Sequence, residues 1–378
     1  MADEPNSVRA NEKNLECNNC KKREGEFEDF DLNLKKSRAK AVSVENVEKA
    51  EETLNALDPA GGQVDHISDV SNDGAKDFRV CNQNGSSDGT RGVREMGFVI
   101  EADAAEDKGS RHTMEDAWVL LPDASLEFPG KLRCAHFAIY DGHGGRLAAE
   151  YAQKHLHVNV LSAGLPRELL DVKAAKKAIV DGFRITDKSL IQESTAGGWQ
   201  DGATAVCVWI LGQTVFVANI GDAKAVVAQL PNADGLWKHE DHVKSLKAIV
   251  LTREHKAIYP QERARIQKAG GVVGSNGRLQ GRLEVSRAFG DRQFKKFGVV
   301  AIPDVHSFDL TDRECFVILG CDGLWGVFGP SDAVDFVQKM LIEGLPVSTV
   351  SHRLVREAVR ERRCKDNCTA VVIVFKRM

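Results

Sequence analysis

The chain has 378 residues, a formal net charge of −4 and a hydrophobic fraction of 42%. This length suits one large domain with an extra segment, or two ordinary domains, and the hydrophobic fraction allows a sizeable core. The near-neutral charge argues against nucleic acid as the main partner, because binding a phosphate backbone needs a clustered excess of Lys and Arg. No membrane span is predicted, since no apolar run reaches the about 18 residues of a transmembrane helix.

Nine cysteines, an odd number in a long chain, and the lack of a signal-like stretch near the N-terminus favour a reducing compartment with free thiols. We therefore expect an intracellular protein, in the cytoplasm, the nucleus or both.

Residues 1–94 are predicted to be a mostly disordered N-terminal extension, because they are polar and poor in aromatic residues. A short polar helix is expected at residues 45–56. Cys17 and Cys20 form a CxxC pair, but a structural zinc site needs about four ligands and no second pair lies nearby, so free thiols are favoured. Two basic clusters, at residues 21–23 and 35–38, fit either a nuclear import signal or a solvated charge run.

Residues 95–378 contain short runs rich in Val, Ile, Ala and Phe, punctuated by Gly, Asp and Pro, as is typical of strands. The runs 203–210 and 214–219, three residues apart, predict an antiparallel hairpin. Apolar residues recur at helical spacing in segments 147–160, 172–193, 260–269, 332–342 and 350–362. Because both faces of such apolar strands need cover, we predict paired sheets flanked by helices.

Four short motifs carry the acidic residues that stand out. Glu115 and Asp116 lie in the first, and Asp141, Asp322 and Asp366 each sit at the edge of an apolar strand beside Gly or Asn. Carboxylates that converge repel one another and raise each other's pKa unless a cation lies among them. Hard oxygen ligands favour Mg²⁺ or Mn²⁺ over Zn²⁺. Each motif alone is typical of a turn, but together they indicate a candidate acidic metal site.

These motifs stand in a longer series that includes SRHTMEDAW, YDGHGG, DGATAV, VSRAFGD, LGCDGLW and KDNCTAVVIVF. From about residue 97 to the C-terminus, the series resembles the metal-dependent protein phosphatase 2C family, most closely plant members and the integrin-linked-kinase-associated type. The resemblance implies that residues 95–378 are a catalytic domain. Its fold would be α+β, a four-layer α/β/β/α sandwich of two antiparallel sheets flanked by helices, with metals at one end.

The resemblance also implies roles for individual residues. Asp141 would bridge two Mg²⁺ or Mn²⁺ ions, with the Gly142 carbonyl and Glu115 on one ion and Asp322 and Asp366 on the other. Arg111 would bind phosphate through its planar guanidinium. His143 would be the general acid. Asp116 would orient ligands or water.

The implied reaction is hydrolysis of phosphoserine and phosphothreonine in proteins. A metal-bridging hydroxide would attack phosphorus without a phospho-enzyme intermediate, so no nucleophilic Cys or Ser is required. The implied partners are phosphoprotein substrates, such as kinases or signalling proteins, and the implied state is a monomer. A non-enzymatic scaffold with the same fold is the main alternative interpretation, and a nuclear adaptor acting through the basic clusters is the second. The scaffold interpretation predicts loss of one or more of the ligands, and all are present.

The sequence departs from the family pattern where many members have an acidic residue four places after Asp322. Gly326 stands there, so a third metal ion is doubtful. Asp201 lies near another third-metal position, and Asp291 is expected to support the site rather than bind metal. Two further family motifs are altered, at residues 221–224 and 254–256, and are interpreted as variants on the scaffold.

Overall fold

Two antiparallel sheets form the centre of the described part of the chain. In the computed structural model this part comprises residues 98–377 without 127, 129, 166–169 and 232–244. It belongs to a compact unit, Ser87–Met378. The predicted extension, with its short helix, its CxxC pair and its basic clusters, lies outside the described residues.

The first sheet has the strand order β1-β11-β10-β6-β7. Its strands are β1 (Phe98–Asp107), β11 (Cys368–Arg377), β10 (Glu314–Gly320), β6 (Lys224–Gln229) and β7 (Lys247–Val250). The second sheet has the order β2-β3-β4-β5-β9, and the short strand β8 (Phe289–Gly290) pairs with β4. Its other strands are β2 (Ala117–Leu121), β3 (Cys134–His143), β4 (Gly202–Leu211), β5 (Thr214–Ile220) and β9 (Asp304–Asp309). The predicted hairpin is confirmed, because β4 and β5 pair antiparallel.

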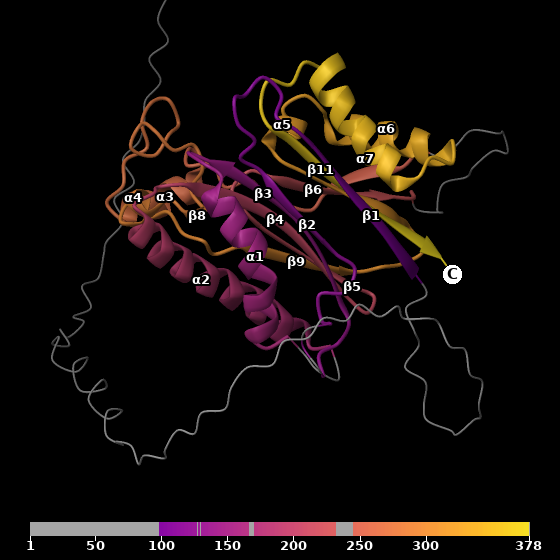
Figure 1. Ribbon diagram of the computed structural model, residues 1–378, viewed down its shortest axis with the longest axis horizontal. Helices are drawn as coiled ribbons and strands as arrows, with labels where there is room; N and C mark the ends of the chain where they lie inside the picture. The colour runs from indigo at the N-terminus through magenta and orange to yellow at the C-terminus, as the bar shows by residue number, and fades with distance from the viewer. Residues whose placement is uncertain (1–97, 127, 129, 166–169, 232–244, 378) are drawn as a thin grey trace, which may run out of the picture. The chain divides into compact units, whose positions relative to one another are not determined.

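Helices cover the outer faces of both sheets, which confirms the predicted four-layer sandwich (Figure 1). On the second sheet lie α1 (Leu147–Ser162) and α2 (Val172–Gly197). On the first lie α6 (Pro330–Ile342), α7 (Val347–Arg356) and the π-helical turn η1 (Glu357–Glu361). The segment between β7 and β9 carries α3 (Pro260–Lys268) and α4 (Arg292–Lys295), and α5 (Asp322–Trp325) follows β10.

Strand β4 shows why the sequence folds into layers. All ten of its residues are buried. Alternate side chains of a strand point to opposite faces. Cys207 and Trp209 therefore join the core beneath α1 and α2, while Val206 and Val208 join the core between the sheets. Because both faces of β4 are covered, its sequence is a nearly continuous run of apolar residues.

The register of the strands brings the predicted acidic motifs to one end of the sandwich. Strand β11 runs antiparallel to β10, and Gly320 pairs with Ala370. The end of β10, followed by Asp322, therefore meets the start of β11, preceded by Asp366. Among the described residues, no helix combines the length and the apolar character needed to cross a bilayer.

Candidate metal centre

Asp141 and Asp322 converge although 181 positions separate them in the sequence. One carboxylate oxygen from each, and the Cys321 Sγ, all lie within 4.8 Å of one another. Cys321 is buried, and burial together with the nearby carboxylates raises the pKa of its thiol well above the ordinary value. A protonated thiol is a poor ligand, so the candidate ligands here are the carboxylates.

A cavity of about 530 Å³ opens over these groups. Seven of the ten predicted site residues line it, namely Arg111, Glu115, Asp141, Gly142, His143, Asp322 and Asp366. The other three, Asp116, Asp201 and Asp291, are buried and are not among the described residues that line the cavity. No cysteine is among the described residues that line the cavity.

The electrostatics of the cavity fit a bound cation. Desolvation and the charges of Asp116, Asp322 and Asp222 raise the pKa of Asp141 well above its ordinary value. Desolvation and the charges of Asp222, Asp366 and Asp116 raise the pKa of Asp322 to about 7. Such shifts mean that the ionised carboxylates lack sufficient positive charge around them. Oxygen donors of this kind are the ligands that Mg²⁺ and Mn²⁺ prefer.

Asp116 is buried directly behind the carboxylates. Its Oδ2 accepts a hydrogen bond of 2.6 Å from the Thr369 hydroxyl, while its Oδ1 is buried and has no hydrogen-bond partner among the described residues. Burial raises the pKa of Asp116 to about 6, against the opposing effect of the Thr369 hydrogen bond. An unpartnered buried carboxylate oxygen is costly unless a ligand satisfies it. The position of Asp116 Oδ1 therefore also fits a nearby cation whose bound water would donate a hydrogen bond to it.

The loop that carries Arg111 and Glu115 is held by Asn367, a residue to which the sequence analysis gave no role. The Asn367 amide nitrogen donates to the carbonyls of Lys108 (3.1 Å) and Thr113 (2.9 Å). Its Oδ1 accepts a bond of 2.8 Å from the backbone N–H of Glu115. The asparagine beside Asp366 was the available signal, since an amide can donate and accept at once.

Close backbone approach explains two glycines at the site. A Cβ on Gly142 would lie 2.3 Å from the Glu115 carbonyl oxygen. A Cβ on Gly109 would lie 2.3 Å from the Asp366 carbonyl oxygen, and Gly109 also has a φ of 58°. Only glycine fits such positions without a shift of the backbone. The two contacts bring Glu115 to the end of β3, and the 108–116 loop to the start of β11.

Arg111 lies at the mouth of the cavity. Its Nη2 donates a bond of 2.7 Å to Asp366 Oδ2, and 61% of its side chain is exposed. The guanidinium therefore keeps donors that face solvent at the edge of the carboxylate cluster.

His143 is held by Asp291. His143 Nε2 lies 2.7 Å from Asp291 Oδ2, and the Asp291 side chain is only 3% exposed. Desolvation opposes the charged imidazole, but the hydrogen bond and charge of Asp291, with the charge of Asp222, outweigh it and raise the pKa of His143. A Cβ on Gly202 would lie 2.3 Å from His143 Nε2 and 2.4 Å from Asp291 Oδ2, so this glycine leaves room for the pair.

The structure places Asp201 at the start of α1. Its Oδ2 accepts a bond of 3.0 Å from the backbone N–H of Leu147, and its carbonyl accepts one from the Asp291 N–H. Asp201 is not among the described residues that line the cavity. Gly326 follows α5 on the surface and offers no carboxylate there.

Asp222, which the sequence analysis assigned to the scaffold, lines the cavity. Lys256 Nζ lies 3.5 Å from Asp222 Oδ2 and 2.9 Å from Glu284 Oε1. Burial and the charges of Glu284 and Glu254 raise the pKa of Asp222, and Lys256 opposes the rise. The two altered family motifs, residues 221–224 and 254–256, therefore meet beside the cavity. Their separation in the sequence gave no sign of this contact.

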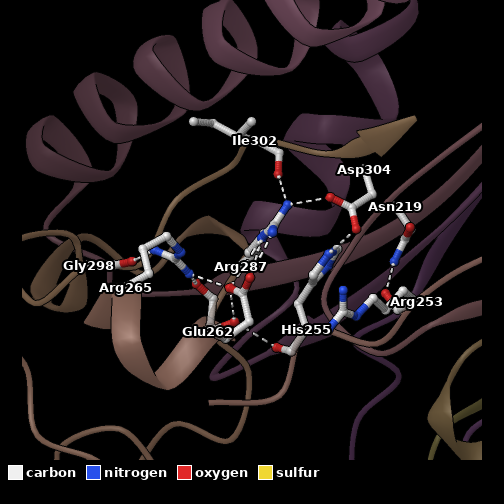
Figure 2. Close-up of polar contacts among 10 residues, drawn as sticks. Asn219, Arg253, His255, Glu262, Arg265, Arg287, Gly298, Ile302 and Asp304 are labelled. Atoms are coloured by element: carbon white, nitrogen blue, oxygen red, sulfur yellow. Dashed lines mark hydrogen bonds and ion pairs between the residues drawn. The ribbon is translucent and has the colours of Figure 1, made fainter. Parts of the chain in front are cut away.

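A buried ion cluster anchors the segment that carries Glu284 and Asp291 (Figure 2). Glu262, on α3, accepts hydrogen bonds from Arg287 (2.7 Å), Arg265 (2.5 Å) and the Ser286 hydroxyl (2.6 Å). Arg287 also donates to Asp304 (2.8 Å) and to the Ile302 carbonyl (3.0 Å). The cluster thus ties α3 and the middle of the 284–291 segment to the β9 edge of the second sheet.

Comparison with known proteins gives a consistent result. The family model described as protein phosphatase 2C matches residues 100–368. Probable protein phosphatase 2C 8 of Arabidopsis thaliana is 78% identical over 281 residues, which are 74% of this chain and 80% of that relative. The integrin-linked kinase-associated serine/threonine phosphatase 2C of Homo sapiens is 35% identical over 295 residues, covering 73% and 72% of the two chains.

Among solved structures, serine-threonine phosphatase 2C from Toxoplasma gondii is similar with a TM-score of 0.62. The sequences are 24% identical, and the match covers 73% of this chain and 95% of the other. At that identity the likeness shows a common fold.

The Glu262 cluster predicts a pH-dependent stability. Burial favours the neutral acid, but hydrogen bonds from Arg287, Ser286 and Arg265 outweigh it and lower the pKa of Glu262 from 4.5 to about 2. A lowered folded-state pKa stabilises the protein above the unfolded pKa, and this contribution is lost as the pH falls towards the folded pKa. Glu262→Gln should therefore lower the free energy of unfolding by about 3 kcal/mol at pH 7.

Urea denaturation at several pH values measures this effect. The difference from wild type should be constant from pH 8 to 5 and should shrink as the pH falls below about 4.5. Glu193→Gln, at an exposed position on α2, should change little. A Glu262→Gln protein as stable as wild type at pH 7 would contradict the role given to this cluster.

Proposed function

Because the chain belongs to the protein phosphatase 2C family and is a protein serine/threonine phosphatase, we propose that it hydrolyses phosphoserine and phosphothreonine at the cavity around Asp141. The observation that carries the proposal is the convergence of the Asp141 and Asp322 carboxylates beside Arg111 and His143. Its substrates are phosphoproteins.

Two divalent cations, Mg²⁺ or Mn²⁺, would be held by carboxylates from both sheets. Asp141, the Gly142 carbonyl and Glu115 would hold one, and Asp322 with Asp366 the other, with Asp141 shared. The raised pKa values of Asp141 and Asp322 support this assignment, because a cation is what would keep both groups ionised at neutral pH. When bound, such ions lower the pKa of a water molecule and offset negative charge on a phosphoryl group.

Two ions rather than three are proposed. Gly326 provides no carboxylate after α5. Asp201 engages the N-terminus of α1 through the N–H of Leu147. A third ion would therefore find fewer ligands here and would bind more weakly.

Arg111 would bind and orient the phosphoryl oxygens. Its guanidinium already contacts Asp366 with one nitrogen, and its exposed donors reach the mouth of the cavity. A planar guanidinium can hold two oxygens at once, which fixes the orientation of a phosphate.

His143 would protonate the departing serine or threonine oxygen. Asp291 occupies Nε2 and favours the charged imidazole, so the ring would hold a proton for transfer near neutral pH. With Nε2 engaged, Nδ1 is the nitrogen left to donate it. Because the attacking water would displace the leaving oxygen directly, no covalent enzyme intermediate is required.

The first prediction of this proposal concerns the metal ligands. The purified protein should hydrolyse a phosphothreonine peptide with Mn²⁺ or Mg²⁺ and not after chelation. Asp322→Asn should lower turnover about 100-fold or more, because a lost ligand weakens the metal clamp. Asp335→Asn, at an exposed position on α6, should leave turnover unchanged. Turnover that is indifferent to metal would disprove the proposal, and a silent wild type would favour the scaffold alternative.

The second prediction concerns His143. Aryl phosphates have good leaving groups that need little protonation, whereas a serine or threonine oxygen needs a proton. His143→Gln should therefore lower kcat about 100-fold on a phosphothreonine peptide, and much less on p-nitrophenyl phosphate. His155→Gln, at an exposed position on α1, is the control. Equal losses on both substrates would argue against a general-acid role.

A further inference from the structure

A basic surface extends from the region of Asp366 along η1 and α7. Residues 352–365 contain six Lys and Arg but only two Glu, in a chain whose formal net charge is −4. Five of the cations are exposed and have no ion pair or side-chain hydrogen bond with the described residues. These five, here called the basic surface, are Arg353, Arg356, Arg360, Arg363 and Lys365.

The helix fixes the direction of this surface. Val350, Leu354 and Val355 are buried, and α7 packs against β1 and β11 (Figure 1). Arg353, Arg356 and Arg360 are three and four residues apart, which places them along one outward face. Beside them, a hollow of about 370 Å³ is lined by Ser348, Thr349, His352, Arg353 and Arg356. The far end of the surface is therefore a shallow, open hollow bordered by side chains that can donate hydrogen bonds.

The near end reaches the proposed reaction site. Lys365 precedes Asp366, and the Lys365 carbonyl accepts a bond of 3.1 Å from the Ser110 N–H, next to Arg111. Along the helix, a rise of about 1.5 Å per residue puts Arg353 roughly 12 Å from the end of η1. A peptide with its phosphorylated residue at Asp366 would need roughly four to eight extended residues to lie along the surface.

We propose that the basic surface binds an acidic segment of the phosphoprotein substrate, several residues away from the phosphorylated residue. This inference rests on the proposed function, and it adds a substrate preference. Guanidinium groups pair with carboxylates through parallel hydrogen bonds. An acidic partner would also be attracted specifically to this side of an otherwise negatively charged chain.

The composition of the surface favours a peptide over other anionic partners. Residues 347–365 contain no Phe, Tyr or Trp on which nucleic-acid bases could stack. None of the exposed large hydrophobic side chains of the described residues lies in that range, whereas helices that lie on a lipid surface insert such side chains. A peptide rich in Asp and Glu needs neither feature.

The test compares phosphothreonine peptides that differ only in a distant tract. Two peptides carry four Glu at positions four to seven residues from the phosphothreonine, one on its N-terminal side and the other on its C-terminal side. Each has a partner peptide with four Gln at the same positions. With the full chain and Mn²⁺ at low salt, KM should be about tenfold lower for one of the Glu peptides than for its Gln partner. The difference should fall to about twofold at 0.5 M salt, because exposed charges are screened.

Charge reversal locates the effect. Arg353→Glu with Arg356→Glu should abolish the preference for the Glu peptide and leave kcat for p-nitrophenyl phosphate unchanged. Lys173→Glu with Lys188→Glu makes the same change of charge on exposed positions of α2 and should retain the preference. Arg353→Gln with Arg356→Gln is a milder change that should reduce the preference for the Glu peptide. It replaces the charge-reversed variant in the test if that variant unfolds.

Two results would overturn the inference. One is equal KM values for Glu and Gln peptides from an enzyme with metal-dependent turnover of p-nitrophenyl phosphate, which would leave the proposed function intact. The other is tighter binding of phosphatidylserine vesicles or single-stranded RNA than of a fluorescent Glu peptide. Fluorescence anisotropy measures the binding of the Glu peptide to the wild-type protein and to the Arg353 and Arg356 variants. This comparison tests the inference even if no turnover is found.

Discussion

The crowding of several carboxylates at one end of the sandwich is the constraint on which the rest of this structure depends. Asp141 ends a strand of one sheet, while Asp322 and Asp366 flank paired strands of the other. Held by these strands, the groups cannot separate, and desolvation together with their mutual repulsion raises the pKa values of Asp141 and Asp322. A bound cation would relieve the repulsion. The same cluster of carboxylates therefore destabilises the metal-free protein and forms the candidate cation site.

A surrounding layer of contacts fixes the groups that would act on the substrate. Asn367 holds the loop of Arg111 and Glu115, and Asp291 holds His143. The Glu262 cluster in turn anchors the segment that ends at Asp291. Residues outside the cavity would therefore determine whether the proposed acid, His143, and the proposed phosphate ligand, Arg111, are correctly placed, as is usual where supporting contacts orient a metal site.

Much of the fold and the acidic residues could be predicted from the sequence because both follow from local patterns. Apolar strands such as β4 need cover on both faces, and Asp141 and Asp322 stand at strand edges beside glycine. The rest depends on approach between distant segments. Nothing near Asp222 in the sequence shows that it lines the cavity. The asparagine at position 367 signals a side chain that can donate and accept, but not which loop it binds. Likewise, the carboxylate of Asp201 meets the N-terminus of α1 only after β4 has paired with β3.

Proton release on metal binding tests the central claim most directly. If desolvation and repulsion keep Asp141 and Asp322 partly protonated in the metal-free protein, Mn²⁺ must displace those protons when it binds. Calorimetric titration in buffers of different ionisation enthalpy should show about two Mn²⁺ per chain, with protons released at pH 6.5 and fewer released at pH 8.5. Asp141→Asn should abolish binding. An absence of Mn²⁺ binding, a third site as tight as the first two, or binding without proton release at pH 6.5 would contradict the account.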